Sequence, residues 1–440
     1  MKALAAHTLH ELQILPREVG ERSVLDLLNR AYTHSGKDHI KQLLSTPLGT
    51  LPEIQQRQKL LQYISANLTE IEFEIPKSYL TAAHNHLDSN LAWNAAKTWF
   101  NRYRLSLWYQ WFSTHDFYRL LSGTTALQKV LGSIGEKTAW WRDSDQLPHE
   151  LQQHAKVLRD FFDHAQPTLT AKLNRISMIE VDFFLRQKYV NQVKAVLAVF
   201  YQLDAFCGIA RFLQTARWAY PSFVQTPEPT FSVTDMKHPV LSEEVAVGND
   251  FSLAFPQRLT LLTGGNMSGK TTFLKACGLV LYLAHLGLPV PARTATLSFF
   301  DRLMTSIHLS DSLDLGYSHF YTELIRIKEV AQAIANGQRV FLLADELFRG
   351  TNPQDAFMCA RQVIDILVRQ SGSLFLISSH LVQLGAPYEK NTSVQFNCFK
   401  TNVLEGELAF THQIEIGITE EQTGLLLLNQ TEVLSCLQQI

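Results

Sequence analysis

The stretch that decides the fold is Leu-Leu-Thr-Gly-Gly-Asn-Met-Ser-Gly-Lys-Thr-Thr, residues 261–272. Its part from Gly264 to Thr271 matches the pattern G-x-x-x-x-G-K-[ST]. Residues 258–263 before it predict a short buried strand, and residues 272–277 after it begin a helical pattern. Strand, glycine loop and helix in this order let backbone N–H groups converge on an anion at a helix start. The stretch therefore predicts a phosphate-binding loop within an α/β domain.

The loop also contains the side chains that a nucleoside triphosphate requires. Glycines allow the backbone to curl around an anion. Lys270 is expected to reach the β- and γ-phosphates of ATP, and the Thr271 hydroxyl is expected to bind Mg²⁺. The predicted binding residues are Gly264, Gly265, Asn266, Met267, Ser268, Gly269, Lys270, Thr271 and Thr272.

A second apolar strand, residues 341–344, is followed directly by Asp345 and Glu346. In open parallel sheets, ligands bind at the carboxyl ends of the strands. Asp345 is therefore expected to sit beside the Mg²⁺, and Glu346 to orient or deprotonate the water that attacks the γ-phosphate. The alternative is an acid pair at a strand end that only faces solvent.

A third apolar strand, residues 374–378, leads into Ser379 and His380. A histidine at this strand end could hydrogen-bond the γ-phosphate and respond to its presence. Taken alone, His380 would be interpreted as a surface histidine. Its position after an apolar strand, in a domain that also contains Asp345 and Glu346, favours the functional interpretation.

Composition narrows the class of protein. The chain has 440 residues, 46% of them hydrophobic and 18% charged, which is typical of a globular protein with two or three domains. The net charge of −2 means that any nucleic-acid contact would need a local basic patch. The five cysteines form no C-x-x-C pair, so neither a zinc site nor a disulfide framework is expected. With no signal-peptide pattern and no uninterrupted apolar span, we expect a cytoplasmic protein without a membrane partner.

The domain organisation follows from a change in pattern along the chain. Helical periodicity predominates over residues 1–219, prolines cluster in residues 220–230, and short strands alternate with helices over residues 231–440. These patterns predict an all-helical domain, a linker, and an α/β domain with a mostly parallel sheet. The expected strands are residues 259–263, 302–307, 340–344, 374–378 and 408–410, and the expected helices are residues 271–286, 320–336, 354–370 and 425–439.

Six of the seven tryptophans lie between Trp93 and Trp141, with arginines among them. Aromatic and arginine side chains together could form a stacking surface for nucleic acid. Aromatic residues at helical spacing more often fill a core, and that interpretation is favoured here.

Taken together, these residues resemble the MutS mismatch-repair ATPases, a branch of the ABC-type ATPases. The similarity is dense from Lys237 to about Gly424 and suggestive over residues 25–52. The matching segments are residues 263–272, similar to T-G-P-N-M-x-G-K-S-T; residues 345–351, similar to D-E-I-G-R-G-T; residues 314–324, similar to the signature S-T-F-M-x-E-M; and residues 237–240, similar to R-H-P-V.

The resemblance implies an ABC-type P-loop ATPase domain preceded by an all-α core and lever domain. It also implies a homodimer in which Ser318 of one chain caps the γ-phosphate held by Lys270 of the other. The implied catalytic residues are Lys270, Ser318, Glu346 and His380.

The implied function is ATP hydrolysis that drives a conformational switch on mismatched, branched or distorted DNA, together with repair or recombination proteins. The alternative is an ATP-driven switch whose partner is a protein or a ribonucleoprotein. The near-neutral charge favours this alternative, and the similarity of residues 25–52 to the family's core domain opposes it.

The chain also departs from the family pattern. It begins where the family's third domain begins, and it contains no Phe-x-Glu motif, so recognition of a mispair by an inserted phenylalanine is not expected. The aromatic residue that the family stacks on adenine is replaced by Val245 or Ala246, which is expected to relax base preference.

Overall fold

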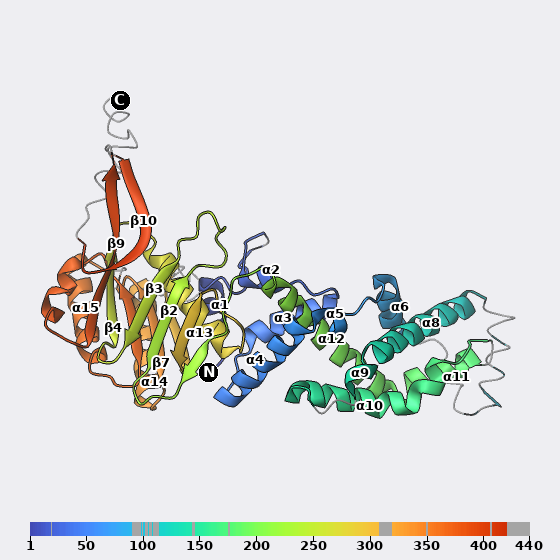
Figure 1. Ribbon diagram of the computed structural model, residues 1–440. Helices are drawn as coiled ribbons and strands as arrows, with labels where there is room; N and C mark the ends of the chain where they lie inside the picture. Colours follow the sequence, from blue (N-terminus) through green and yellow to red (C-terminus); the bar gives the residue numbers. More distant parts are fainter. Residues whose placement is uncertain are drawn as a thin grey trace, which may run out of the picture. The chain divides into compact units, whose positions relative to one another are not determined.

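The computed structural model describes residues 1–18, 20–89, 98, 100–101, 104, 108, 114–142, 146–174, 177–307, 319–348, 351–404 and 407–419 (Figure 1). The chain divides into two compact units. The first, here called the α/β unit, consists of Met1–Leu27, Gln42–Gln58 and Ala216–Ile440. The second, here called the helical unit, consists of Leu28–Lys41 and Lys59–Thr215.

The main sheet of the α/β unit has six strands in the order β10-β9-β4-β8-β7-β6. Neighbouring strands from β9 to β6 are parallel, and β10 pairs with β9 in the antiparallel sense at the edge. The predicted mostly parallel sheet is therefore confirmed. The strands are β4 (Leu259–Gly264), β6 (Arg302–Ser306), β7 (Val340–Asp345), β8 (Leu374–Ser378), β9 (Val394–Leu404) and β10 (Glu407–Ile416).

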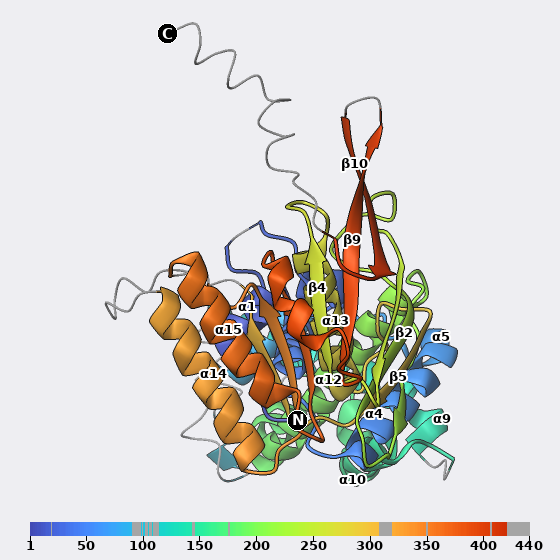
Figure 2. The same cartoon turned by 90° about the vertical axis from the view of Figure 1, so that its left-hand side faces the viewer.

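Helices cover both faces of this sheet. On one face, Leu342 of β7 and Phe375 of β8 share a buried cluster with residues of α14 (His319–Ala335) and α15 (Pro353–Leu367). Figure 2 shows α14 and α15 side by side. The next residue of β7, Leu343, points to the opposite face because strand side chains alternate, and it contacts α13 (Lys270–His285). Every residue of β7 and β8 is buried, as expected for strands covered on both faces.

A second, four-stranded sheet in the order β1-β5-β2-β3 was not predicted. Its strands are β1 (Ser222–Val224), β2 (Thr230–Met236), β3 (Asn249–Ala254) and β5 (Thr294–Ser298). Strand β1 lies within residues 220–230, which the sequence suggested as a linker, and it pairs in parallel with β5. The linker prediction is therefore corrected for these residues. Prolines favour extended backbone, which suits an edge strand as well as a linker.

The α/β unit also includes the start of the chain, where the sequence predicted a continuous helical domain over residues 1–219. Glu11, in α1 (Ala6–Glu11), is buried and accepts hydrogen bonds from Thr305 Oγ1 at 2.6 Å and Arg326 Nη1 at 2.9 Å. Tyr282 Oη donates to the Leu44 carbonyl at 2.9 Å. These contacts join residues more than 230 positions apart, so local sequence patterns could not reveal them.

All described elements of the helical unit are helices. Three helices belong to this unit only in part: α2 (Val24–Leu28), α3 (His34–Ser45) and α4 (Leu51–Ala66). The helices that belong to it entirely are α5 (Leu68–Ile71), α6 (Lys77–Leu87), α8 (Thr114–Lys137), α9 (Ala139–Arg142), α10 (His149–Leu169), α11 (Ser177–Phe183), the π-helical turn η1 (Phe184–Lys188) and α12 (Val190–Leu213). Among the described residues, α12 alone is long and apolar enough to cross a membrane, and 72% of that apolar window is buried. Such burial is typical of a core helix.

Two sequence expectations fall partly or wholly outside the described residues. Trp93, Trp99 and Trp111 lie outside them, and so does the helix expected at residues 425–439. Of the remaining tryptophans in that cluster, Trp141 is buried, whereas Trp108 and Trp140 are exposed. The core interpretation therefore holds for Trp141 and is wrong for the other two.

Candidate nucleotide-binding site

The glycine-rich loop connects the end of β4 to the start of α13. Gly264 has a φ of +145° and Gly269 a φ of +112°, a region of backbone conformation that favours glycine. A Cβ atom on Gly264 would lie 2.9 Å from the Phe399 carbonyl oxygen and from Ser268 Oγ. Both conformation and space therefore require glycine at residue 264. Gly269 directly precedes the first turn of α13, where backbone N–H groups favour an anion.

Lys270 folds back over this loop. Its side chain is buried, and Nζ donates to the carbonyl oxygens of Gly264 at 2.8 Å and Gly265 at 2.9 Å. The ammonium group therefore lies within the curl of backbone that the sequence predicts to surround a phosphate. Phosphate oxygens are stronger acceptors for a cation than carbonyl oxygens, so the arrangement fits a phosphate ligand.

Thr271, in the first turn of α13 after β4, meets Asp345 at the end of β7. Strand β8 lies between β4 and β7, so the carboxyl ends of these three strands are adjacent. Thr271 Oγ1 donates to Asp345 Oδ2 at 2.6 Å, and the Ser378 hydroxyl donates to the other oxygen of the same carboxylate. Hydroxyl and carboxylate oxygens are ligands that Mg²⁺ prefers, usually together with phosphate oxygens and water. The residues present therefore fit a magnesium ion shared with a phosphate.

Glu346 and His380 form a pair beside them. His380 Nε2 lies 2.5 Å from Glu346 Oε1, and the Glu346 backbone N–H donates to the Ser378 carbonyl at 3.1 Å. Glu346 has a φ of +60°, a conformation that a non-glycine residue adopts at a cost of about 1 kcal/mol. From sequence alone, His380 was expected to contact a γ-phosphate, and its pairing with Glu346 was not foreseen.

Other predicted site residues are placed differently. Ser318 lies outside the described residues, so its role stays a prediction. Met267 has a φ of +66°, and its side chain is 71% exposed and lines the cavity beside the loop. Asn266 and Thr272 are part of the loop and of the first turn of α13, as expected. Among the described residues, no three His, Cys, Asp or Glu side chains gather as a metal cluster.

A cavity of about 230 Å³ lies directly beside the loop. Its lining includes Gly269 and Thr272 from the loop and α13, Val245 from the β2–β3 connection, and His412 from β10. His412 Nδ1 donates to the Ser268 carbonyl at 3.0 Å, and its ring stacks on Phe410. The His412 ring, held against the loop, therefore forms one side of the cavity. Val245 lines the cavity, in keeping with the expected loss of an aromatic residue.

His238 also lines this cavity, and sequence reasoning missed that role. Its side chain is buried, and neither ring nitrogen has a hydrogen-bond partner in the described part of the chain. Burial, and secondarily the nearby Lys275 charge, lower the pKa of His238 to about 4. The imidazole in the wall of the cavity is thus neutral, with one donor and one acceptor nitrogen. No local pattern indicates this role, because residues 237–240 stand out only as a family motif.

The fold and the site together define an α/β domain with a glycine-rich phosphate-loop motif at the carboxyl end of a mostly parallel sheet.

Comparisons with known proteins agree with this kind of domain. Residues 260–435 match the family described as MutS domain V. The chain is 30% identical over 250 residues to the DNA mismatch repair protein MutS of Granulibacter bethesdensis, and 29% identical over 262 residues to that of Bacillus licheniformis.

These alignments cover 55% and 57% of this chain, but only 27% and 30% of the two relatives. A third relative, MutS of Ehrlichia ruminantium, is 28% identical over 239 residues, covering 54% of this chain and 29% of its own length. The chain thus spans less than a third of the length of these curated relatives. Over residues 260–435, the chain is therefore similar to MutS domain V.

Proposed function

We propose that this chain hydrolyses ATP and uses the cycle to switch conformation on DNA, in mismatch repair or a related repair or recombination process. The similarity of residues 260–435 to MutS domain V supports the general role. The observation that carries the proposal is the meeting of Lys270, Thr271, Asp345, Glu346 and His380 at three adjacent strand ends. Each side chain has the chemistry that phosphoryl transfer to water requires.

The hydrolytic step follows from these contacts. Lys270 exchanges its two carbonyl partners for the β- and γ-phosphates of the substrate, and the backbone of the loop surrounds them. Thr271 and Asp345 would hold Mg²⁺, which would neutralise phosphate charge when bound. Glu346 orients the attacking water and accepts its proton. His380 fixes the Glu346 carboxylate through their 2.5 Å contact and stabilises its charge.

The cavity beside the loop is proposed to hold the base and ribose of the nucleotide. The His412 ring supplies a flat surface for a base, and the His238 ring forms part of the cavity wall. Val245 offers no aromatic face on its side of the cavity. We therefore expect weaker discrimination between ATP and GTP than two stacked aromatic rings would give.

A homodimer is part of the proposal. The resemblance of residues 314–324 to the family signature implies that Ser318 of the partner chain completes the γ-phosphate site. The γ-phosphate then bridges two surfaces, and its hydrolysis removes the bridge. The helical unit is proposed to transmit the resulting change to DNA.

ATPase rates and DNA affinity test the proposal together. ATP turnover is measured with no DNA and with homoduplex, mismatched and branched DNA, and affinity is measured at two salt concentrations. Binding through phosphates should weaken with salt, with a log–log slope of roughly −0.9 per phosphate contacted on duplex DNA. ATP hydrolysis without salt-sensitive binding to any of these DNAs would support a protein or ribonucleoprotein partner instead. Absence of hydrolysis under all conditions would overturn the proposed activity.

A further inference from the structure

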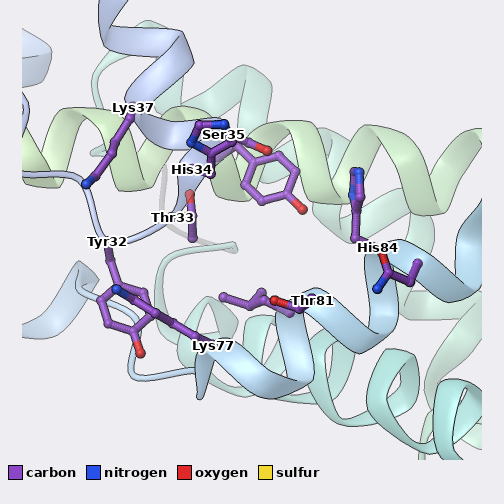
Figure 3. Close-up of a pocket in the computed structure, with 11 residues that line it drawn as sticks. Tyr32, Thr33, His34, Ser35, Lys37, Lys77, Thr81 and His84 are labelled. Atoms are coloured by element: carbon purple, nitrogen blue, oxygen red, sulfur yellow. The ribbon is translucent and has the colours of Figure 1, made fainter. Parts of the chain in front are cut away.

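The helical unit contains a cavity of about 380 Å³ that the proposed ATPase activity does not use (Figure 3). One wall is a stripe of α6 in which Lys77, Thr81 and His84 follow one another at helical spacing. The first turn of α3 and the preceding Tyr32 form another wall, and Tyr201 of α12 completes the lining. We propose that this cavity is a binding site for a nucleoside phosphate, either free or at the end of a nucleic-acid strand.

The charge of the lining favours an anion. Four side chains that can carry positive charge, Lys37, Lys77, His34 and His84, line the cavity, and no carboxylate does. In the described part of the chain, the two lysines make no ion pair with a carboxylate, and Lys77 Nζ instead lies 4.8 Å from the centre of the Tyr32 ring. Figure 3 shows Lys37 and the Tyr32–Lys77 pair toward one end of the cavity and His84 toward the other. The charged groups in the cavity lining are thus basic only, in a chain whose net charge is −2.

Two carboxylates lie near the histidines without entering the lining. Asp38 lies 3.9 Å from His34 Nε2, and Asp88 lies 3.6 Å from His84 Nε2. All four of these side chains are more than half exposed, so these contacts contribute little free energy. The lysines are therefore expected to supply most of the attraction for a phosphate.

The backbone at the entrance to α3 is held in place by a buried carboxylate. Asp204 accepts hydrogen bonds from the Tyr32 N–H at 2.9 Å, the Thr33 N–H at 2.7 Å and Thr33 Oγ1 at 2.7 Å. A Cβ atom on Gly36 would lie only 2.4 Å from Asp204 Oδ2, so the glycine permits this close approach. Three donors satisfy the Asp204 charge, and the first turn of α3 is fixed before any ligand arrives. Such preorganisation lowers the entropic cost of binding.

The size and shape of the cavity favour a nucleoside phosphate over a bare phosphate ion. A volume of about 380 Å³ falls within the range of small-molecule sites, which is about 300–1,000 Å³. Tyr32 and Tyr201 contribute flat rings and Leu80 an apolar side chain to the same lining that carries the lysines. A base can stack on a tyrosine ring while its phosphate faces the ammonium groups. Thr81 and Asn85 add neutral hydrogen-bonding groups along α6.

Calorimetric titration of the full chain tests this site. The probes are AMP, UMP, inorganic phosphate, and a short single-stranded oligonucleotide with and without a 5′-phosphate. The test variant carries Lys37→Ala and Lys77→Ala, and Lys156→Ala serves as a control on an exposed lysine of the same unit. A Lys270→Ala chain separates this site from the phosphate loop. We expect the affinity for nucleoside phosphates to be unchanged in Lys270→Ala and in Lys156→Ala. In the variant that carries both Lys37→Ala and Lys77→Ala, we expect the affinity to fall at least tenfold.

The outcomes distinguish the sources of the ligand. Binding of both monophosphates supports a free nucleotide, whereas binding of the 5′-phosphorylated oligonucleotide alone supports a strand end. Inorganic phosphate binding as tightly as AMP would overturn the nucleoside part of the proposal. Binding that is lost in Lys270→Ala, or no binding of any probe, would overturn the site itself. ATP hydrolysis, measured on the same variants, reports separately on the proposed function, because Lys37 and Lys77 do not belong to the phosphate-loop site.

Discussion

At the scale of single residues, Glu346 and His380 are the most informative pair. The left-handed backbone of Glu346 and its 2.5 Å contact with His380 fix the carboxylate just after the end of β7. Glu346→Gln keeps the size of the side chain but removes the proton acceptor. We expect ATP turnover to fall roughly 10²–10⁴-fold while ATP binding persists. Rapid-quench hydrolysis and equilibrium nucleotide binding measure the two effects.

The matched control for this prediction is Glu389→Gln, which changes the same charge at an exposed position of the same unit. Its turnover should equal that of the parent chain. If Glu346→Gln hydrolyses ATP at the parent rate, Glu346 is not the general base. His380→Ala should give a smaller decrease, because it removes the group that positions the carboxylate and leaves the carboxylate itself.

At the scale of elements, α13 connects the phosphate loop to a buried histidine at its far end. His285 Nδ1 donates to the Leu281 carbonyl at 2.8 Å, and Nε2 accepts from the Phe300 N–H at 3.0 Å. These partners define a neutral imidazole, because a second ring proton would face the Phe300 N–H. Burial lowers the pKa of His285 to about 3. Protonation of this ring is therefore expected to destabilise the helix end.

This arrangement predicts how stability depends on pH. An unfolded histidine titrates near pH 6.5, whereas folded His285 stays neutral down to about pH 3. The contribution of His285 is thus fully present above about pH 6.5 and is lost as the pH falls toward 3, by at most about 1.4 kcal/mol per pH unit. His285→Gln can keep both hydrogen bonds without titrating. Denaturant unfolding at pH 7.5 and 5.0 should show a smaller pH effect in this variant.

His164→Gln, at an exposed position in α10, is the control and should leave the pH effect unchanged. Buried His238 and His154, whose pKa values are also lowered, contribute in the same direction and remain in the variant. An identical pH effect in the parent chain and His285→Gln would show that the ring is not kept neutral by the fold.

At the scale of the whole molecule, the proposed dimer can be tested by mixing two inactive chains. Lys270→Ala removes the phosphate lysine, and Ser318→Ala removes the residue implied to act from the partner. In a mixed dimer, one of the two composite sites is intact. Equal mixing should therefore restore roughly a quarter of the parent ATPase activity. If Ser318 acts within its own chain, mixing restores nothing.

The main features of the site could be predicted from sequence because its residues lie in short contiguous patterns. A strand, a glycine loop and a helix start specify the phosphate loop locally, and apolar strands that end in Asp345 and in His380 specify its neighbours. The Glu346–His380 contact and the unpartnered His238 could not be predicted in this way. Both depend on which strand lies beside which, and β8 follows β7 in the chain but lies between β7 and β4 in the sheet.

Residues 259–380 could be assigned from sequence to an α/β domain with a predicted phosphate loop, because periodicity and glycine chemistry act over a few residues. The tertiary structure was needed to show that the first 27 residues belong to that domain, and that residues 222–224 are a strand rather than a linker. It also decided that a lysine-lined cavity opens between α3, α6 and α12. Each of these depends on contacts between distant residues, which local propensity does not encode. Short contiguous patterns therefore suffice to predict the loop, whereas the cavities and contacts around it depend on the fold.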